Sequence, residues 1–326
     1  MLDGAVFVET AARLHFGVLD LAGSLGRWFG GIGAAAPAPT LLLSAERASD
    51  VSAEGEDAVR AAEFAARFIA FHQLRQGAKI RVHRALPAHS GLGSGTQLAL
   101  AVARALAEIH DIDADAPSLA RAVGRAQRSA IGTWTFAGGG LVVEGGRRRG
   151  SNECGPLIAR LQIPDSWRCI VAIPDASPGI SGQREDEAFA QLPAPAGGDV
   201  ARVAHLVLIA LLPAVAEDDV ETFGGALTEI QEITGRWFAP IQGSIFTPGP
   251  SEELIRAMRR WGAFGVGQSS WGPAVYGIVN SEDAGVRLAG RVRDALGSAG
   301  VVYEGPFRSS GARVWREQAT LPQSGA

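Results

Sequence analysis

The chain contains few cysteines and almost no lysine, and these shortages exclude several classes of protein. Cys154 and Cys169 are the only cysteines, so the sequence has neither a disulfide framework nor a cysteine-based metal motif. Lys79 is the single lysine, and arginine supplies all other basic residues. Genome composition is the simplest explanation of that bias, yet arginine grips phosphate and carboxylate through a planar fork. The net charge of −4 provides no basic field for nucleic acid, so we expect no such partner.

Long apolar runs are also missing. The longest one, residues 206–216, is shorter than the roughly 20 residues that span a bilayer. The first four residues, Met1–Leu2–Asp3–Gly4, contain no basic region followed by an apolar segment. We therefore expect a soluble, cytoplasmic protein that does not bind membranes. With 326 residues, 47% of them apolar, the chain can bury a large core and is predicted to form about two domains.

The spacing of apolar residues predicts an α+β fold. Strands and helices intermix without the strict βαβ alternation of a doubly wound sheet. Alternation predicts strands over residues 5–20, 40–46, 79–86, 141–144, 169–173, 274–279 and 300–304. Helical spacing predicts helices over residues 57–75, 98–109, 118–129, 200–216, 220–235, 251–261 and 283–297. For the helix with the apolar stripe at 98–109, Ser94 or Thr96 is the expected N-cap. Gly- and Pro-rich composition predicts loops at 23–39, 176–183 and 192–199. We place the domains at 1–165 and 166–326, with a frayed tail after Trp315.

The most informative motif is the glycine-rich stretch at residues 86–97, between a predicted strand and a predicted helix. Such a loop leaves backbone N–H groups unpaired, and the helix N-terminus adds a partial positive charge. The motif predicts a phosphate site built by Ser90, Gly91, Gly93, Ser94, Gly95 and Thr96. It is neither a Walker motif, which needs a Lys-Ser/Thr pair, nor a dinucleotide fingerprint. A tight turn without a ligand is the structural alternative.

The loop resembles the phosphate loop of the galactokinase, homoserine kinase, mevalonate kinase and phosphomevalonate kinase (GHMP) superfamily. A later block, residues 265–272, resembles the C-terminal motif of those kinases. The resemblance implies a GHMP-kinase-like architecture, with an N-terminal phosphate-binding domain and a ferredoxin-like C-terminal domain. Many of those kinases use an aspartate as the base, but the matching run, residues 129–133, has Gly132 at that position. Neither Gly132 nor the adjacent Thr133 can act as a carboxylate base.

Four blocks resemble one non-kinase branch more closely, the β-ribofuranosylaminobenzene 5′-phosphate synthases. They cover residues 12–33, 91–97, 131–140 and 267–273. The resemblance implies transfer of ribose 5-phosphate from phosphoribosyl pyrophosphate to 4-aminobenzoate or a 4-hydroxybenzoate-like acid. A carbon–carbon bond forms, and pyrophosphate and carbon dioxide leave, in a step of methanopterin biosynthesis and one-carbon metabolism. We expect a homodimer that uses Mg²⁺ with unidentified ligands, and no ATP, nicotinamide or pyridoxal phosphate.

This resemblance ranks the candidate site residues. The acid needs a bidentate cationic anchor, for which Arg13 and Arg27 lead and Arg125 and Arg128 follow. We predict a catalytic set of Arg13, His15 and Thr133 and a substrate-binding set of Arg27, Arg128, Gln268, Ser269, Ser270 and Trp271.

Several roles stay open at this point. His15 is either a core histidine or a site residue, and His89 either touches a phosphate or faces solvent. Asp20 holds magnesium or caps a turn, and Trp271 stacks on the acid or only packs. Two other functions also stay open, an ATP-dependent small-molecule kinase that uses another base and a catalytically silent phosphate-ligand sensor.

Overall fold

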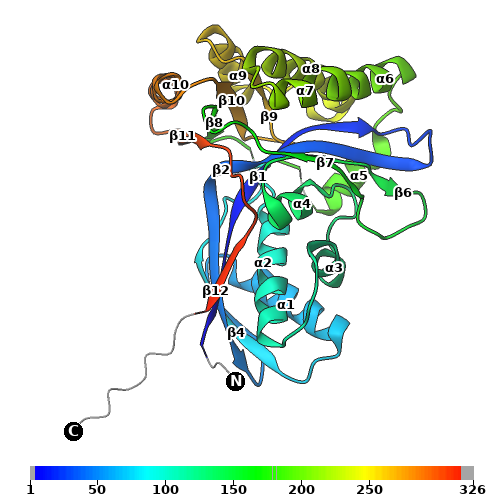
Figure 1. Ribbon diagram of the computed structural model, residues 1–326, viewed down its shortest axis with the longest axis vertical. Helices are drawn as coiled ribbons and strands as arrows, with labels where there is room; N and C mark the ends of the chain where they lie inside the picture. Colours follow the sequence, from blue (N-terminus) through cyan, green and yellow to red (C-terminus); the bar gives the residue numbers. More distant parts are fainter. Residues whose placement is uncertain (1–3, 178, 181, 317–326) are drawn as a thin grey trace.

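The computed structural model describes residues 4–177, 179–180 and 182–316 and has two sheets covered by helices (Figure 1). The first sheet has eight strands, with β12–β1–β2–β4–β3 as its main order. Strands β5 and β6 both pair with β2, and β7 pairs with β5. Its strands are β1 (Val6–Asp20), β2 (Arg27–Ala48), β3 (Ser52–Gly55), β4 (Gly77–Arg84), β5 (Leu141–Glu144), β6 (Arg147–Arg148), β7 (Leu157–Leu161) and β12 (Arg313–Arg316).

Four helices accompany the first sheet: α1 (Ala58–His72), α2 (Ser94–Ile109), α3 (Ala116–Ala122) and α4 (Ile131–Gly138). Helix α2 packs on β1 and β2 and is almost entirely buried. In this helix, 12 of the 16 residues lie in the interior. Its small alanine side chains allow the neighbouring elements to pack this closely. The helix predicted from the apolar stripe at residues 98–109 is thus confirmed, but its N-cap is Gly93, and the expected N-cap at Ser94 or Thr96 is wrong.

The second sheet is antiparallel, with the order β11–β8–β10–β9. Its strands are β8 (Arg168–Pro174), β9 (Gly265–Gln268), β10 (Val275–Val279) and β11 (Gly300–Pro306). The accompanying helical segments are α5 (Gln183–Gln191), α6 (Gly197–Leu206), the π-helical η1 (Val207–Leu211), α7 (Leu212–Ala216), α8 (Val220–Gln242), α9 (Pro250–Arg260) and α10 (Glu282–Leu296). The predicted α+β class is confirmed.

The predicted loop at residues 23–39 is wrong, because most of it belongs to strand β2. Its glycines and alanines allow close packing. A Cβ on Gly33 would lie 2.3 Å from the carbonyl oxygen of Leu14 and 2.6 Å from Cγ2 of Ile131. Helix α4 therefore sits directly on the strand. The small residues that suggest a loop in the sequence are required here by sheet and helix packing.

Two helical predictions also need correction. The predicted helix 118–129 ends at Ala122, and the chain then forms a loop with left-handed Gly124 and Ala126. The short helix α4 that follows was not predicted, because its glycine and threonine content resembles a turn. The predicted helix 200–216 begins earlier, at Gly197, and contains the π-helical segment η1.

The two sheets share one large core. Phe16 of β1 packs against Tyr276 of β10, with ring centroids 5.0 Å apart, and against Phe307 at 6.5 Å. Helix α8 contacts both β1 and β9 and so joins the sheets (Figure 1). A smaller core lies beneath α9 and α10. The boundary at residue 165 stays a prediction.

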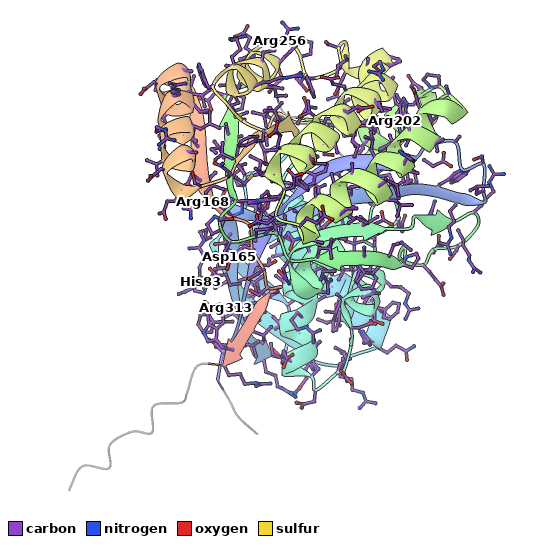
Figure 2. The ribbon with its side chains drawn as sticks, turned by 45° about the horizontal axis from the view of Figure 1, so that its top comes forward. His83, Asp165, Arg168, Arg202, Arg256 and Arg313 are labelled. Carbon is purple, nitrogen blue, oxygen red and sulfur yellow. The ribbon has the colours of Figure 1, made fainter. Side chains whose placement is uncertain are left out.

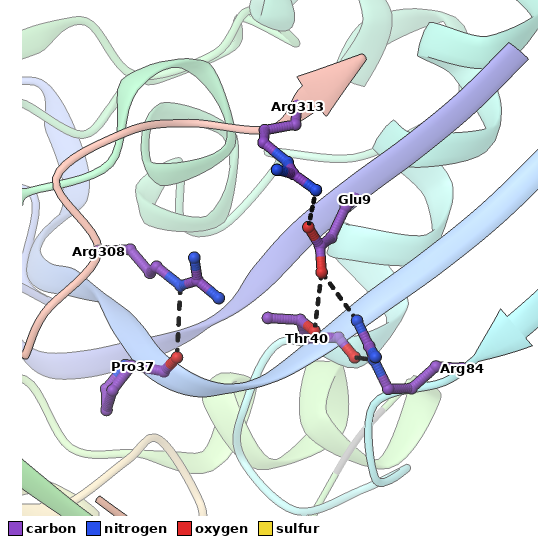
Figure 3. A network of polar contacts seen from close by, with 6 residues as sticks. All are labelled: Glu9, Pro37, Thr40, Arg84, Arg308 and Arg313. Atoms are coloured by element: carbon purple, nitrogen blue, oxygen red, sulfur yellow. Dashed lines mark hydrogen bonds and ion pairs between the residues drawn. The ribbon is translucent and has the colours of Figure 1, made fainter. Parts of the chain in front are cut away.

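The end of the described chain returns to the first sheet, although residues 166–326 were assigned to the second domain. Strand β12 pairs antiparallel with β1. Glu9 of β1 receives ion pairs from Arg84 at 2.8 Å and Arg313 at 3.0 Å, and so links β4 and β12 (Figure 3). The frayed tail predicted after Trp315 lies largely outside the described residues.

One helical stretch in the described chain, Gly197–Ala216, is long and apolar enough to cross a membrane by length and composition alone. The sequence prediction counted only the unbroken apolar run 206–216 and so missed it. One such helix is weak evidence for a membrane span, because core helices of soluble proteins meet the same criteria. Here the stretch packs along α8 within a globular fold.

Candidate functional site

A cavity of about 720 Å³ opens between the two sheets, a size typical of small-molecule sites. Its walls come from β1, from the loop before α2, from α5 and α8, and from the loop after β9. Of the predicted residues, those that line it are Arg13, His15, Gly91, Gly93, Ser94, Gly95, Thr96, Arg128, Gln268, Ser270 and Trp271.

The glycine loop begins α2 directly at this cavity. Gly91 and Gly93 have φ values of 83° and 75°, in the left-handed region that glycine adopts without strain. Gly93 is the N-cap of α2, and its carbonyl accepts the N–H of Thr96 at 3.0 Å. For the N–H groups of Ser94 and Gly95, no acceptor is found among the described residues. These two amides, at the positive end of a buried helix, are free to donate hydrogen bonds to an anion.

The loop fits tightly against two other segments. A Cβ on Gly91 would lie 2.2 Å from the carbonyl oxygen of Ser269, and one on Gly93 would lie 2.8 Å from Cγ of Arg13. The Arg13 guanidinium donates to the Gly91 carbonyl at 2.5 Å, and its backbone N–H donates to Leu92 at 3.0 Å. Glycine is therefore required at Gly91 and Gly93 because a side chain would collide with these neighbouring segments, and not only because a ligand needs room at the start of α2.

Arg13 and His15 lie together at one edge of the cavity, where Arg13 alone carries a charge. Burial lowers the pKa of Arg13 to about 10, while the charge of Glu185 opposes that shift. Arg13 therefore keeps its charge at neutral pH. Burial, followed by the charge of Arg13, lowers the pKa of His15 to about 3. His15 is thus a neutral imidazole that can exchange hydrogen bonds with a ligand but supplies no positive charge.

Three further arginines line the same cavity near the start of α2: Arg60 and Arg67 of α1, and Arg125. Arg125 was a secondary candidate in the sequence, whereas the two arginines of α1 were missed. Their seven-residue spacing on one helix face was the available signal, but nothing local shows that this face turns toward the glycine loop.

Part of the cavity lining is aromatic. Trp271 packs edge-to-face with Phe238 of α8, with ring centroids 4.8 Å apart, and with Phe189 of α5 at 5.8 Å. Phe189 also contacts Phe29 of β2 at 5.4 Å. All four rings line the cavity. The site therefore combines cationic and aromatic lining, which suits a ligand with phosphates at one end and an aromatic ring at the other.

Four predicted site residues do not line the cavity. Ser90 is buried, and its hydroxyl donates to Pro87 at 2.8 Å to close the turn. Ser269 has no exposed surface; its hydroxyl donates to the Gly91 carbonyl at 2.8 Å and accepts the N–H of His15 at 3.0 Å. Arg27 donates to the Gly146 carbonyl at 2.9 Å near the β1–β2 turn. These contacts hold the site's framework together.

Thr133 also requires correction as a catalytic candidate. On α4, consecutive side chains point about 100° apart, so Gly132 faces the cavity while Thr133 is fully buried. Its hydroxyl has no hydrogen-bond partner among the described residues. A Cβ on Gly132 would lie 3.0 Å from Cγ2 of Thr96. A side chain at the position of the kinase base would therefore begin in tight contact with the first turn of α2.

Two predicted residues line the cavity but already have partners. Arg128 pairs with Glu185 at 2.6 Å and also with Asp186, which ties α5 to the loop before α4. The Gln268 side chain accepts the N–H of Thr247 at 2.7 Å and donates to the Ser270 carbonyl at 3.0 Å. Of the predicted carboxylate anchors, Arg13 and Arg125 line the cavity without an ion-pair partner among the described residues.

The remaining alternatives can be assigned in part. Asp20 caps a turn, since its Oδ1 accepts the N–H groups of Ala22 and Gly23 at 2.6 and 3.0 Å. His89 lines the cavity beside the loop. The described residues contain no group of three or more His, Cys, Asp or Glu that fits a metal ion. Mg²⁺ is often held by only one or two carboxylates together with substrate phosphates, so the Mg²⁺ expectation stays a prediction.

Comparisons with known proteins agree with this architecture. Residues 57–139 match the GHMP kinases N terminal domain, and residues 211–298 match the GHMP kinases C terminal domain. A homoserine kinase structure from Cytophaga hutchinsonii superimposes with a TM-score of 0.72 at 16% identity, covering 97% of this chain and 98% of that one. A Lactococcus lactis galactokinase, complexed with galactose, gives 0.68 at 10% identity, covering 96% and 95%. At these identities the kinase structures establish the fold alone.

Closer relatives carry a different name. A beta-ribofuranosylphenol 5'-phosphate synthase of Methanothermobacter thermautotrophicus is 35% identical over 322 residues, which covers 92% of this chain and 96% of the relative. A protein of the same name from Archaeoglobus fulgidus is 36% identical, covering 90% of this chain and 93% of the relative.

Proposed function

Because this chain belongs to the beta-ribofuranosylphenol 5'-phosphate synthase family, we propose that it joins ribose 5-phosphate to an aromatic acid. Phosphoribosyl pyrophosphate is the donor. The relatives' name specifies a phenol, which favours a 4-hydroxybenzoate-like acceptor over the 4-aminobenzoate that was considered first. The observation that carries the proposal is the single cavity with cationic and aromatic lining.

The proposed reaction breaks two bonds and forms one. The bond between the anomeric carbon and pyrophosphate breaks, and the bonding pair leaves with pyrophosphate. The ring carbon that bears the carboxylate attacks the anomeric carbon and forms the carbon–carbon bond. The bond to the carboxylate then breaks, carbon dioxide leaves, and its bonding electrons restore the aromatic ring. This is phosphoribosyl transfer with decarboxylation, and no ATP is consumed.

The cavity residues suit these steps. The amides of Ser94 and Gly95 would stabilise the negative charge that develops on departing pyrophosphate. Trp271 and Phe238 would hold the acceptor ring and exclude water from the cationic ribose. Arg13 lies at the edge of the loop with its charge retained, and would anchor the acceptor carboxylate until decarboxylation.

A kinase reaction is supported less well. Glycine stands at the position of the kinase base, and Glu185 and Asp186 are the cavity-lining carboxylates of the described chain. Both are ion-paired with Arg128. A silent sensor would have the same cavity without turnover.

The deciding experiment uses carboxyl-labelled 4-hydroxybenzoate with phosphoribosyl pyrophosphate and no ATP. We expect labelled carbon dioxide and pyrophosphate in equal amounts, and a higher rate than with 4-aminobenzoate. Arg13→Ala should lower kcat/KM by roughly 10- to 150-fold, the equivalent of a lost charged hydrogen bond. Arg104→Ala, outside the cavity, is the control. Phosphate transfer from ATP, or ligand-induced thermal stabilisation without any product, would refute the synthase assignment.

The predicted homodimer and cytoplasmic location remain predictions. Leu208 and Ile209 of η1 are 59% and 66% exposed, and together they offer an apolar surface on the C-terminal helices. Light scattering of the purified chain would determine the oligomeric state. A pathway role in methanopterin biosynthesis is part of the proposal and follows from the product.

A further inference from the structure

Three arginine side chains line the cavity together near the start of helix α2, and two of them lie directly against its first turn. A Cβ on Gly95 would lie 2.7 Å from Nη2 of Arg60 and 3.0 Å from Nη2 of Arg125. Arg67 also belongs to α1. The guanidinium groups of Arg67 and Arg125 both lie over the ring of Phe64, at 5.7 and 4.9 Å from the ring centroid. Cations from two separate segments thus meet beside Gly95.

These charges are compensated only in part. The arginines labelled on the C-terminal unit in Figure 2, Arg168, Arg202 and Arg256, each pair with a glutamate at 2.6 or 2.7 Å. In the cavity, Arg60 pairs with Asp57 at 3.1 Å. Arg67 and Arg125 have no carboxylate within ion-pair distance in the part of the chain that the structure describes.

Arg125 is the most constrained member. Its Nε is buried and has no hydrogen-bond partner among the described residues. Burial, and then the charges of Arg60, Arg67 and Arg128, lower the pKa of Arg125 to about 10, against a weaker opposing effect of Glu185. A buried donor without an acceptor, surrounded by like charges, costs stability unless an anion is bound.

We propose that Arg60, Arg67 and Arg125 form a second anion subsite, which binds a phosphate group of the substrate next to the one held by the loop amides. The chemistry fits a phosphate monoester or one end of pyrophosphate, since planar guanidinium groups bind such oxygens in pairs. The identity of the donor rests on the proposed function, but the subsite itself does not. A donor with phosphate groups at two positions would engage both subsites at once.

The test measures binding of inorganic pyrophosphate and of ribose 5-phosphate to the full chain by calorimetry, at constant ionic strength. Arg67→Gln and Arg125→Gln should raise the Kd of at least one probe by about tenfold or more. Arg121→Gln removes the same charge from an exposed position outside the cavity and should change neither Kd by more than about twofold. Loss of pyrophosphate binding assigns the leaving-group end, and loss of ribose 5-phosphate binding assigns the 5-phosphate end.

Thermal unfolding without ligand provides the second measurement. If the cluster is an anion subsite, removing one arginine relieves repulsion, so the variants should melt at or above the wild-type temperature. Variants that bind both probes like the wild type would overturn the proposal. Arg67 is exposed, so its variant tests the subsite even if Arg125→Gln folds poorly. Weakened anion binding in a protein that yields no carbon dioxide would leave the subsite intact and refute the proposed reaction instead.

Discussion

A substitution at Gly93 should affect the backbone conformation, the packing of Arg13 and ligand binding together. Its φ of 75° is strained for any other residue, and its missing Cβ leaves room for Arg13. We predict that Gly93→Ala lowers stability by about 1–2 kcal/mol, the cost of a left-handed alanine. It should also displace Arg13 and raise the Kd of the donor by about tenfold. Urea unfolding and calorimetry measure the two effects.

The matched control is Gly26→Ala. Gly26 has a similar φ of 79°, but nothing lies within 4 Å of its added Cβ. It should lose a similar amount of stability with donor binding unchanged. Equal donor affinity in the two variants would show that contact with Arg13 has no part in binding.

His15 makes stability depend on pH. Its pKa is lowered to about 3 in the folded protein, whereas an unfolded histidine titrates near 6.5. Between these values the unfolded chain binds the additional proton, so stability falls as pH decreases. The slope contributed by this residue reaches about 1.4 kcal/mol per pH unit. We predict that His15→Gln flattens the decline between pH 6.5 and 4, measured by urea unfolding.

An exposed histidine on α6 provides the comparison for that measurement. His205→Gln should keep the wild-type slope. If His15→Gln also keeps the wild-type slope, burial does not lower the pKa of His15 in the folded protein.

At the scale of elements, Glu144 at the end of β5 positions helix α4. Its carboxylate is buried and accepts the N–H groups of Ala130 at 3.3 Å and Gly146 at 2.8 Å. Burial raises the pKa of Glu144, while both hydrogen bonds oppose that shift. We predict that Glu144→Ala, which leaves both donors without their acceptor, destabilises the chain by about 2 kcal/mol or more.

Thermal and urea unfolding measure this loss, with Glu153→Ala as an exposed control nearby. Because Gly132 of α4 packs on Thr96, the same change should also weaken donor binding. A variant as stable as the wild type would mean that solvent or another group replaces the carboxylate at this helix end.

Elements with strong local patterns were predictable from the sequence, and elements defined by tertiary packing were not. Helix α2 carries its own stripe of apolar residues directly after the glycine-rich motif. Strand β2 has small residues where Leu14 and Ile131 pack closely against it. The residues next to β2 in the sequence give no sign of that contact. Likewise, the glycine loop is a local motif, whereas Arg60 reaches it only because α1 packs beside α2. The cluster of Arg60, Arg67 and Arg125 could therefore be identified only from the structure.

For the molecule as a whole, the cavity depends on how the C-terminal unit is held against the phosphate loop. Ser269, next to the end of β9, makes that connection. Its hydroxyl donates to the Gly91 carbonyl and accepts the N–H of His15, so one side chain fixes both β1 and the loop. The close approach of the Ser269 carbonyl to Gly91 reinforces the same contact. Trp271, two residues later in the same segment, contributes to the aromatic lining of the cavity.

We therefore predict that Ser269→Ala raises the KM for the donor and the acceptor together, about fivefold to tenfold. The loss of hydrogen bonds should also lower stability by about 1–3 kcal/mol. Ser251→Ala separates the two effects, because the buried Ser251 hydroxyl donates to Pro273 at 2.9 Å within the C-terminal unit alone. That control should lose stability with little change in KM. Steady-state kinetics and thermal unfolding of both variants measure the two effects. KM values for Ser269→Ala equal to those of the wild type would mean that the two units hold the cavity together without Ser269.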